Sequence, residues 1–187
     1  MLQLIIPATP DIDFYDEQNN EFIVVPGLKK EQVLRLEHSL VSLSKWESKW
    51  CKAFLSKQAK TVEETIDYIK CMTLTQNVDP TVYNYLTNDH ITQVNDYIGA
   101  PMTATVFSEN NNRGGGREVI TAELIYYWMI ALNIPFECQK WHLNRLLTLI
   151  RVCSIKNTPA KKQNPRDIMS RNAALNAARR KQLNSQG

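Results

Sequence analysis

The sequence lacks a run of about eighteen apolar residues, the length that a helix needs to cross a bilayer. Its beginning, MLQLIIPATPDIDFYDE, has no basic stretch and turns acidic at once, so we do not interpret it as a secretory signal. The chain has 187 residues, 43% of them hydrophobic and 22% charged, which is enough for one domain with a packed core, with or without an appendage. We expect no association with a membrane.

Motifs for metal binding and catalysis are missing too. The sequence contains no Cys-x-x-Cys, His-Glu-x-x-His or Gly-x-Ser-x-Gly motif, and no pair of carboxylates stands out. Zinc sites bring their ligands in close pairs, so we interpret the cysteines as reduced core residues, with disulfide bonds as the alternative. The three histidines are far apart in the sequence. We predict that the chain is not an enzyme and holds no metal or cofactor. The residues concerned are Cys51, Cys71, Cys138, Cys153, His38, His90 and His142.

A glycine-rich segment, Arg113-Gly-Gly-Gly-Arg117, precedes an expected helix, where backbone N–H groups can bind phosphate. The segment lacks the Gly-Lys-Ser/Thr ending of a P-loop and does not clearly follow a strand. We therefore interpret residues 108–118 as a flexible surface loop.

Residues 1–38 predict a small N-terminal β-sheet. The segments LQLIIP (Leu2 to Pro7) and EFIVVP (Glu21 to Pro26) are rich in β-branched residues and end at prolines. Residues 32–37 alternate between apolar and polar side chains and predict a third strand. We interpret the acidic segment DIDFYDEQNN as the turn-rich connection between the first two strands.

Residues 39–155 predict a helical body. Ser39 can cap a helix whose apolar residues recur every three or four positions, and Thr61 with Glu64 forms a capping box for a second helix that ends near Met72. Asp79-Pro80 begins a short helix, and Thr87 or Asn88 begins another that ends at residues 99–101.

The stretch EVITAELIYYWMIAL predicts a helix that is apolar on all sides in its second half, and such helices are usually buried. Asn133-Ile134-Pro135 ends this helix, and a second helix follows from Phe136 to about Ile155. We expect the pair to form a buried helical hairpin at the core. The predicted fold class is α+β and predominantly α-helical.

The segment KWHLNRLLTLIRVC raises the question of whether it forms a site or a core helix. At 100° per residue its leucines, Ile150 and Cys153 share one arc, so we interpret it mainly as core-facing, with His142 a hydrogen-bonded residue at the edge of that arc. Trp141 and Val152 flank Arg145 on a second, smaller patch. An aromatic side chain beside an arginine is typical of a binding surface, which makes these three residues candidates for partner binding. Contact with another part of the same chain is the alternative.

Charge is unevenly distributed along the chain. The net charge is +3, but residues 156–187 carry eight Lys or Arg residues against one acid, a net charge of +7, which leaves −4 for the rest. We interpret this segment as a basic C-terminal extension with a polar linker over residues 157–165 and a marginal helix from Arg166. It could bind nucleic acid phosphates, dock on an acidic or helical partner, or remain solvated; it contains no aromatic residue, which argues against binding to single strands. The candidate binding residues are Lys161, Lys162, Arg166, Arg171, Arg179, Arg180 and Lys181.

Three blocks of the sequence resemble a family of tailed-bacteriophage proteins: SLVSLSKWESKW, REVITAELIYYWMIALNIPFECQKWHLNRLLTLIRVC and ALNAARRKQLNSQG. The family is similar to the tail assembly chaperones of long-tailed phages. The resemblance implies a chaperone that binds the tape-measure protein, helps to recruit tail-tube subunits, acts in the host bacterial cytoplasm and is absent from the mature virion. The N-terminal strands and the basic end are not explained by this resemblance and leave room for a different role in the tail module.

Two other functions remain open from the sequence. One is a structural virion protein of the phage tail or neck, in which the basic extension locks neighbouring subunits. The other is a nucleic-acid-binding regulator that uses the basic extension. Association into a homo-oligomer is compatible with all three functions.

Overall fold

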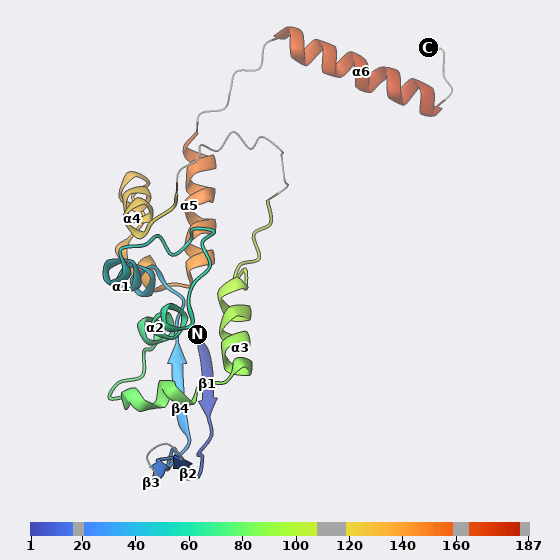
Figure 1. The fold of residues 1–187 in the computed structure, drawn as a ribbon. Coiled ribbons are helices and arrows are strands. Elements are labelled where there is room, and N and C mark those ends of the chain that lie inside the picture. The colour runs from blue at the N-terminus through green and yellow to red at the C-terminus, as the bar shows by residue number, and fades with distance from the viewer. Residues whose placement is uncertain (17–20, 108–118, 159–164, 184–187) are drawn as a thin grey trace. The chain divides into compact units, whose positions relative to one another are not determined.

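A computed structural model of the chain describes residues 1–16, 21–107, 119–158 and 165–183. The fold is α+β and predominantly helical, as the sequence predicts (Figure 1). Residues 1–153 form one compact unit and residues 154–187 a second. The first unit begins with β1 (Leu2–Ile6), β2 (Ile12–Asp16), β3 (Glu21–Val25) and β4 (Gln32–Leu36). Its helices are α1 (Leu40–Trp50), α2 (Val62–Met72), η1 (Pro80–Tyr85), α3 (Asn88–Gly99), α4 (Ala122–Ala131), η2 (Phe136–Lys140) and α5 (Leu143–Asn157), which continues into the second unit and precedes α6 (Pro165–Leu183).

The first and last strands form an antiparallel ribbon, with Leu4 opposite Leu34 and Leu2 opposite Leu36. Alternate side chains of both strands, Leu4, Leu34 and Leu36 among them, are buried against the helices, while the other face is solvated. Glu37 N donates to Met72 O over 2.9 Å, which joins this ribbon to the end of α2. The strands predicted at residues 2–7 and 32–37 are therefore confirmed.

The interpretation of residues 12–16 as part of a turn-rich connection is wrong. These residues form β2, which pairs with β3 in a second antiparallel ribbon from Ile12↔Val25 to Asp16↔Glu21. Aspartate is rare in strands, so the aspartates obscure the strand pattern of Ile12, Phe14 and Tyr15 in the sequence. These residues form a strand because they pair with β3.

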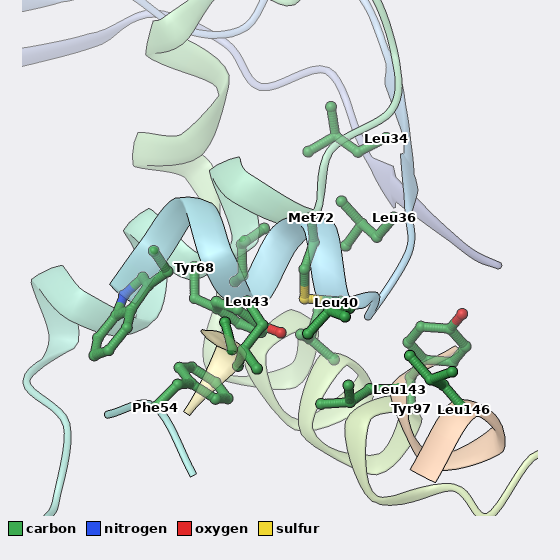
Figure 2. Close-up of a cluster of buried hydrophobic side chains, with 14 of the residues drawn as sticks. Leu34, Leu36, Leu40, Leu43, Phe54, Tyr68, Met72, Tyr97, Leu143 and Leu146 are labelled. Carbon is green, nitrogen blue, oxygen red and sulfur yellow. The ribbon is translucent and has the colours of Figure 1, made fainter. Parts of the chain in front are cut away.

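The helix starts follow the predicted caps. Ser39 accepts from Ser42 N, and Thr61 and Glu64 exchange hydrogen bonds in a capping box. Trp46 reaches from α1 to α2, where its indole N–H donates to Glu64 O over 2.9 Å. The side chains that meet around α1 come from β4, α2, α3 and α5, so α1 lies at the centre of the core (Figure 2).

The predicted helix from Phe136 to Ile155 is wrong in its first part. Residues 136–140 form the short 3-10 helix η2, Trp141 is extended, and α5 begins only at Leu143. The break is tertiary in origin, because Leu143 N donates to His38 O over 2.7 Å and Ser39 forms a β-bridge with His142.

The expectation that the apolar helix is buried on all sides is also wrong. Ala122, Ile125 and Met129 of α4 are buried, but Tyr127 is 63% and Ile130 61% exposed. The core therefore centres on α1, and α4 covers only one side of it.

The cysteines do not all lie in the core. Cys138 is buried, Cys71 and Cys153 are half-buried, and Cys51 is exposed at the left-handed C-cap of α1. All four are free thiols.

Helix α6 belongs to the second unit and agrees with the helix predicted from Arg166. The predicted loop at residues 108–118 and most of the predicted linker lie outside the described residues.

Candidate functional site

The outward face of α4 is the strongest candidate for a binding site. We call Tyr127, Ile130, Ala131 and Phe136, all of which are exposed, the α4 surface. Tyr127 lies one turn from both Ile130 and Ala131, so the three side chains share one face of the helix. Phe136 of η2 is 51% exposed and its ring centroid lies 6.4 Å from that of Tyr126, which is itself one turn from Ile130. The apolar surface is thus continuous from α4 to η2.

A buried carboxylate fixes the start of α4. Glu47 of α1 accepts from Ala122 N through Oε2 over 2.7 Å and from Phe54 N through Oε1 over 2.8 Å. Thr121 also caps the helix by accepting from Leu124 N. One side of α4 is therefore tied to α1, and this orientation directs Tyr127 and Ile130 away from the core.

A tight turn places η2 beside α4. Asn133 has a left-handed φ of 53°, and Ile134 N donates to Met129 O over 2.8 Å. Tyr126 Oη then donates to Gln139 Oε1 over 2.9 Å. These contacts hold Phe136 at the edge of the α4 surface.

The predicted pairing of Trp141 with Arg145 is present. The guanidinium carbon of exposed Arg145 lies 4.1 Å from the ring centroid of half-buried Trp141, within the range of a cation–π contact. The two residues do not share a helix, since Trp141 precedes α5. Val152 is half-buried and lies about 10 Å further along the helix axis than Arg145.

The predicted basic residues are only partly described. Arg179, Arg180 and Lys181 are exposed on α6. Arg166 and Arg171 also belong to α6 by their backbone positions. Lys161 and Lys162 lie outside the described residues.

Two histidines pack together in the core, a contact that the sequence does not predict. The rings of His38 and His142 lie 5.1 Å apart, His38 Nδ1 shares a 2.6 Å hydrogen bond with Tyr68 Oη, and His142 Nε2 lies 3.0 Å from Tyr97 O. Burial, together with the charge of His142, lowers the pKa of His38 to about 3, and burial also lowers the pKa of His142. Both imidazoles are therefore neutral, hydrogen-bonded core groups.

A cavity of about 620 Å³ lies between the end of β3 and η1. Lys29, Lys30 and Asp79 contribute charged groups to its lining, and Tyr85 Oη beside it donates to Pro26 O. None of the residues predicted to bind a partner lines this cavity. It is an open, mixed surface rather than an apolar pocket with converging polar groups.

Within residues 1–16, 21–107, 119–158 and 165–183, no group of three or more His, Cys, Asp or Glu residues is arranged to hold a metal ion. No helix in the same part of the chain is long and apolar enough to span a membrane. Comparison of the chain with protein-family models, curated proteins and solved structures finds no match.

Proposed function

We propose that the chain is a phage tail assembly chaperone that binds the tape-measure protein and helps to recruit tail-tube subunits in the host bacterial cytoplasm. The observation that carries this proposal is the α4 surface, where the large apolar side chains of Tyr127 and Ile130 are exposed to solvent. Contiguous exposed apolar surface marks interaction sites, because its hydration costs about 25 cal/mol per Å².

The composition of the surface suits a helical protein partner. Tyr, Phe and Ile supply apolar area to the α4 surface. The Trp141–Arg145 pair, which is not part of the α4 surface, consists of residue types that dominate binding energy in interfaces. A helical segment can lay its apolar stripe against another helix by ridges-into-grooves packing. The resemblance of the sequence to tail assembly chaperones is the reason for proposing a segment of the tape-measure protein as this partner.

The test is co-expression with the tape-measure protein of the same genome, followed by affinity purification. The double variant Tyr127→Gln/Ile130→Gln removes the apolar side chains while keeping a good helix former at both positions. We expect it to fold normally and to lose binding at least about tenfold, a change of about 1.4 kcal/mol. The matched control is Val62→Gln, which removes an apolar side chain that is 71% exposed on α2.

The outcomes distinguish binding by the helical body from binding by the basic extension. Binding by a chain that ends at Thr158 supports the α4 surface, whereas recovery of the tape-measure protein only by the full chain assigns binding to the basic extension. Unchanged binding by the double variant contradicts the role of the α4 surface. Recovery of no tape-measure protein by the full chain overturns the chaperone proposal.

A structural role in the phage tail or neck is the second candidate, and the ribbon of β2 and β3 favours it. All five residues of β3 are exposed, which suits a segment that becomes covered in an assembly. Mass spectrometry of purified virions decides between the two functions, because a structural protein is present in stoichiometric amount and a chaperone is not.

Exposed Arg179, Arg180 and Lys181 favour the remaining candidate, a nucleic-acid-binding regulator. Binding to duplex DNA that weakens steeply with salt and disappears on deletion of residues 159–187 would support it.

A further inference from the structure

The β2–β3 hairpin, residues 12–16 and 21–25, exposes apolar side chains on both faces. The register places Ile12, Ile23 and Val25 on one face, and Tyr15, Phe22 and Val24 on the other. Phe22 is 76% exposed and Ile12 62%. Antiparallel ribbons normally solvate a polar face, and two strands alone are marginal in water. A surface of this kind is expected to be covered by another element.

The two sides of the hairpin are joined to each other at its base. Gly27 N donates to Asp11 Oδ1 over 2.6 Å, while Leu28 N donates to Thr9 Oγ1 over 2.8 Å and Thr9 N to Leu28 O over 2.9 Å. The two chain segments approach so closely that a Cβ on Gly27 would lie 2.1 Å from Thr9 O. Figure 1 shows β2 and β3 at the end of the β1–β4 ribbon that lies away from α1 and α4. Leu28, just after the hairpin, is buried in the core, so the base of the hairpin is joined to the rest of the first unit.

Charge determines which partner this surface suits. Residues 1–28 contain five acidic residues and neither Lys nor Arg, so two hairpins that met face to face would repel each other. A basic segment with apolar side chains is the complementary partner.

The chain itself contains such a segment. Helix α6 spans residues 165–183, which hold five Lys or Arg residues and a single acid. Its apolar side chains Met169, Leu175 and Leu183 are exposed. At 100° per residue these three positions lie within about a third of the helix circumference, so one side of α6 can meet an apolar surface. The 19-residue helix is about 28 Å long and the five-residue strands are about 17 Å, so α6 can cover a hairpin face and still place basic side chains beyond it.

We propose that the β2–β3 hairpin of one molecule is covered by α6 of a second copy, so that the protein self-associates. Each copy offers one hairpin and one helix, and reciprocal exchange between two copies gives a closed dimer. A helix over a two-stranded ribbon also supplies the second layer that the hairpin needs for stability. The proposal does not depend on the tape-measure protein or on the α4 surface.

The experiment measures the mass of the full-length protein by sedimentation equilibrium at low salt over a range of concentrations. We expect a mass above that of the monomer. The variants Asp13→Lys/Glu21→Lys in the hairpin and Arg179→Glu/Arg180→Glu in α6 each reverse exposed charges. Each is expected to weaken self-association at least tenfold, and the four substitutions together are expected to restore it, because the charges are again opposite.

The double variant Lys45→Glu/Lys57→Glu is the matched control for the α6 variant, since it makes the same change of charge on exposed lysines outside both elements. Far-UV circular dichroism verifies that each variant is folded. A monomeric wild-type protein at every concentration overturns the proposal. So does a dimer that dissociates equally in the control, or one that the combined charge reversal fails to restore.

Discussion

At the scale of single residues, Glu47 joins α1 to two other segments of the chain. Its carboxylate is buried and accepts two backbone N–H groups, one from Phe54 and one from Ala122, which lies 75 residues away in the sequence. A carboxylate is suited to this position because both of its oxygens are acceptors. The neighbouring residues in the sequence do not predict the burial of Glu47, because it has the spacing of a solvent-exposed acid on an amphipathic helix.

Glu47→Gln is expected to destabilise the first unit by about 2–3 kcal/mol. The amide offers one acceptor and turns an NH2 group toward a backbone N–H, so a buried donor loses its charge-assisted hydrogen bond. Urea denaturation measures the change. Glu31→Gln, an exposed position, is the control and is expected to alter stability by less than about 0.5 kcal/mol. Equal effects of the two substitutions would contradict this role for Glu47.

The buried histidines make stability depend on pH. Burial, with the charge of His142, holds the pKa of His38 at about 3 in the fold, below its ordinary value of 6.5, so the unfolded chain binds a proton first. The contribution of neutral His38 to the free energy of unfolding is therefore fully present above pH 6.5 and is lost as the pH falls. One pKa unit corresponds to about 1.4 kcal/mol, so His38 alone lowers the free energy of unfolding by roughly 2 kcal/mol at pH 5. The lowered pKa of His142 acts in the same direction.

His38→Asn is expected to flatten this dependence between pH 7.5 and pH 5, because Asn does not titrate and keeps a side chain that can form a hydrogen bond with Tyr68 Oη. Urea unfolding at several pH values measures the slope. His90→Asn, which removes a histidine outside the buried pair, is the matched control. If both variants lose the same slope, the effect does not come from the His38–His142 pair.

At the scale of elements, the β2–β3 hairpin depends on the close approach of Gly27 to residues 9 and 10. Gly27→Ala would place a Cβ 2.1 Å from Thr9 O and 2.3 Å from Pro10 O, and backbone atoms cannot yield as a flexible side chain can. We expect the base of the hairpin to open, at a cost of about 1–3 kcal/mol. Hydrogen exchange should show faster exchange of the amides of β2 and β3.

Gly99→Ala is the matched control for this prediction. Gly99 is the last residue of α3, and a Cβ there would meet nothing within 4 Å. We expect this substitution to be neutral or slightly stabilising, because alanine lowers the entropy of the unfolded chain. Unchanged exchange in β2 and β3 of Gly27→Ala would show that the hairpin does not need this contact.

Elements were predictable from the sequence where their signals are local. The caps of α1, α2 and α3 act within three residues, and the alternation in β1 and β4 repeats every second residue. The start of α5 was not predictable, because a β-bridge from Ser39 to His142 interrupts an otherwise helical pattern. Trp141 and Arg145 were placed together on the sequence although they do not share a helix, so this candidate pair was found for an incorrect reason.

At the scale of the whole molecule, the two compact units divide within α5, between residues 153 and 154. The side chains of residues 169, 170 and 172–183 of α6 are exposed. A helix of this length and composition is marginal by itself. The first unit should therefore fold without the extension.

A chain that ends at Thr158 is expected to keep its melting temperature within about 2 °C in dilute solution, while its far-UV circular dichroism loses the contribution of α6. Leu146→Ala in the same shortened chain is the control for sensitivity. Leu146 is fully buried in α5, so its truncation should cost about 2–5 kcal/mol and lower the melting temperature clearly. A melting temperature that falls by as much on removal of the extension would show that the first unit requires it.

The sequence by itself determined the predominantly helical α+β class, most helix starts and the basic character of the C-terminal extension. These depend on caps, periodicity and charge, which act over a few residues or need no partner. Only the tertiary structure decided that β2 pairs with β3, that α1 forms the centre of the core, and that α4 and the β2–β3 hairpin keep apolar faces in solvent. The reason is that burial depends on packing between segments that are distant in the sequence. An apolar stretch therefore predicts a surface that favours burial, but not whether the same chain or a partner buries it.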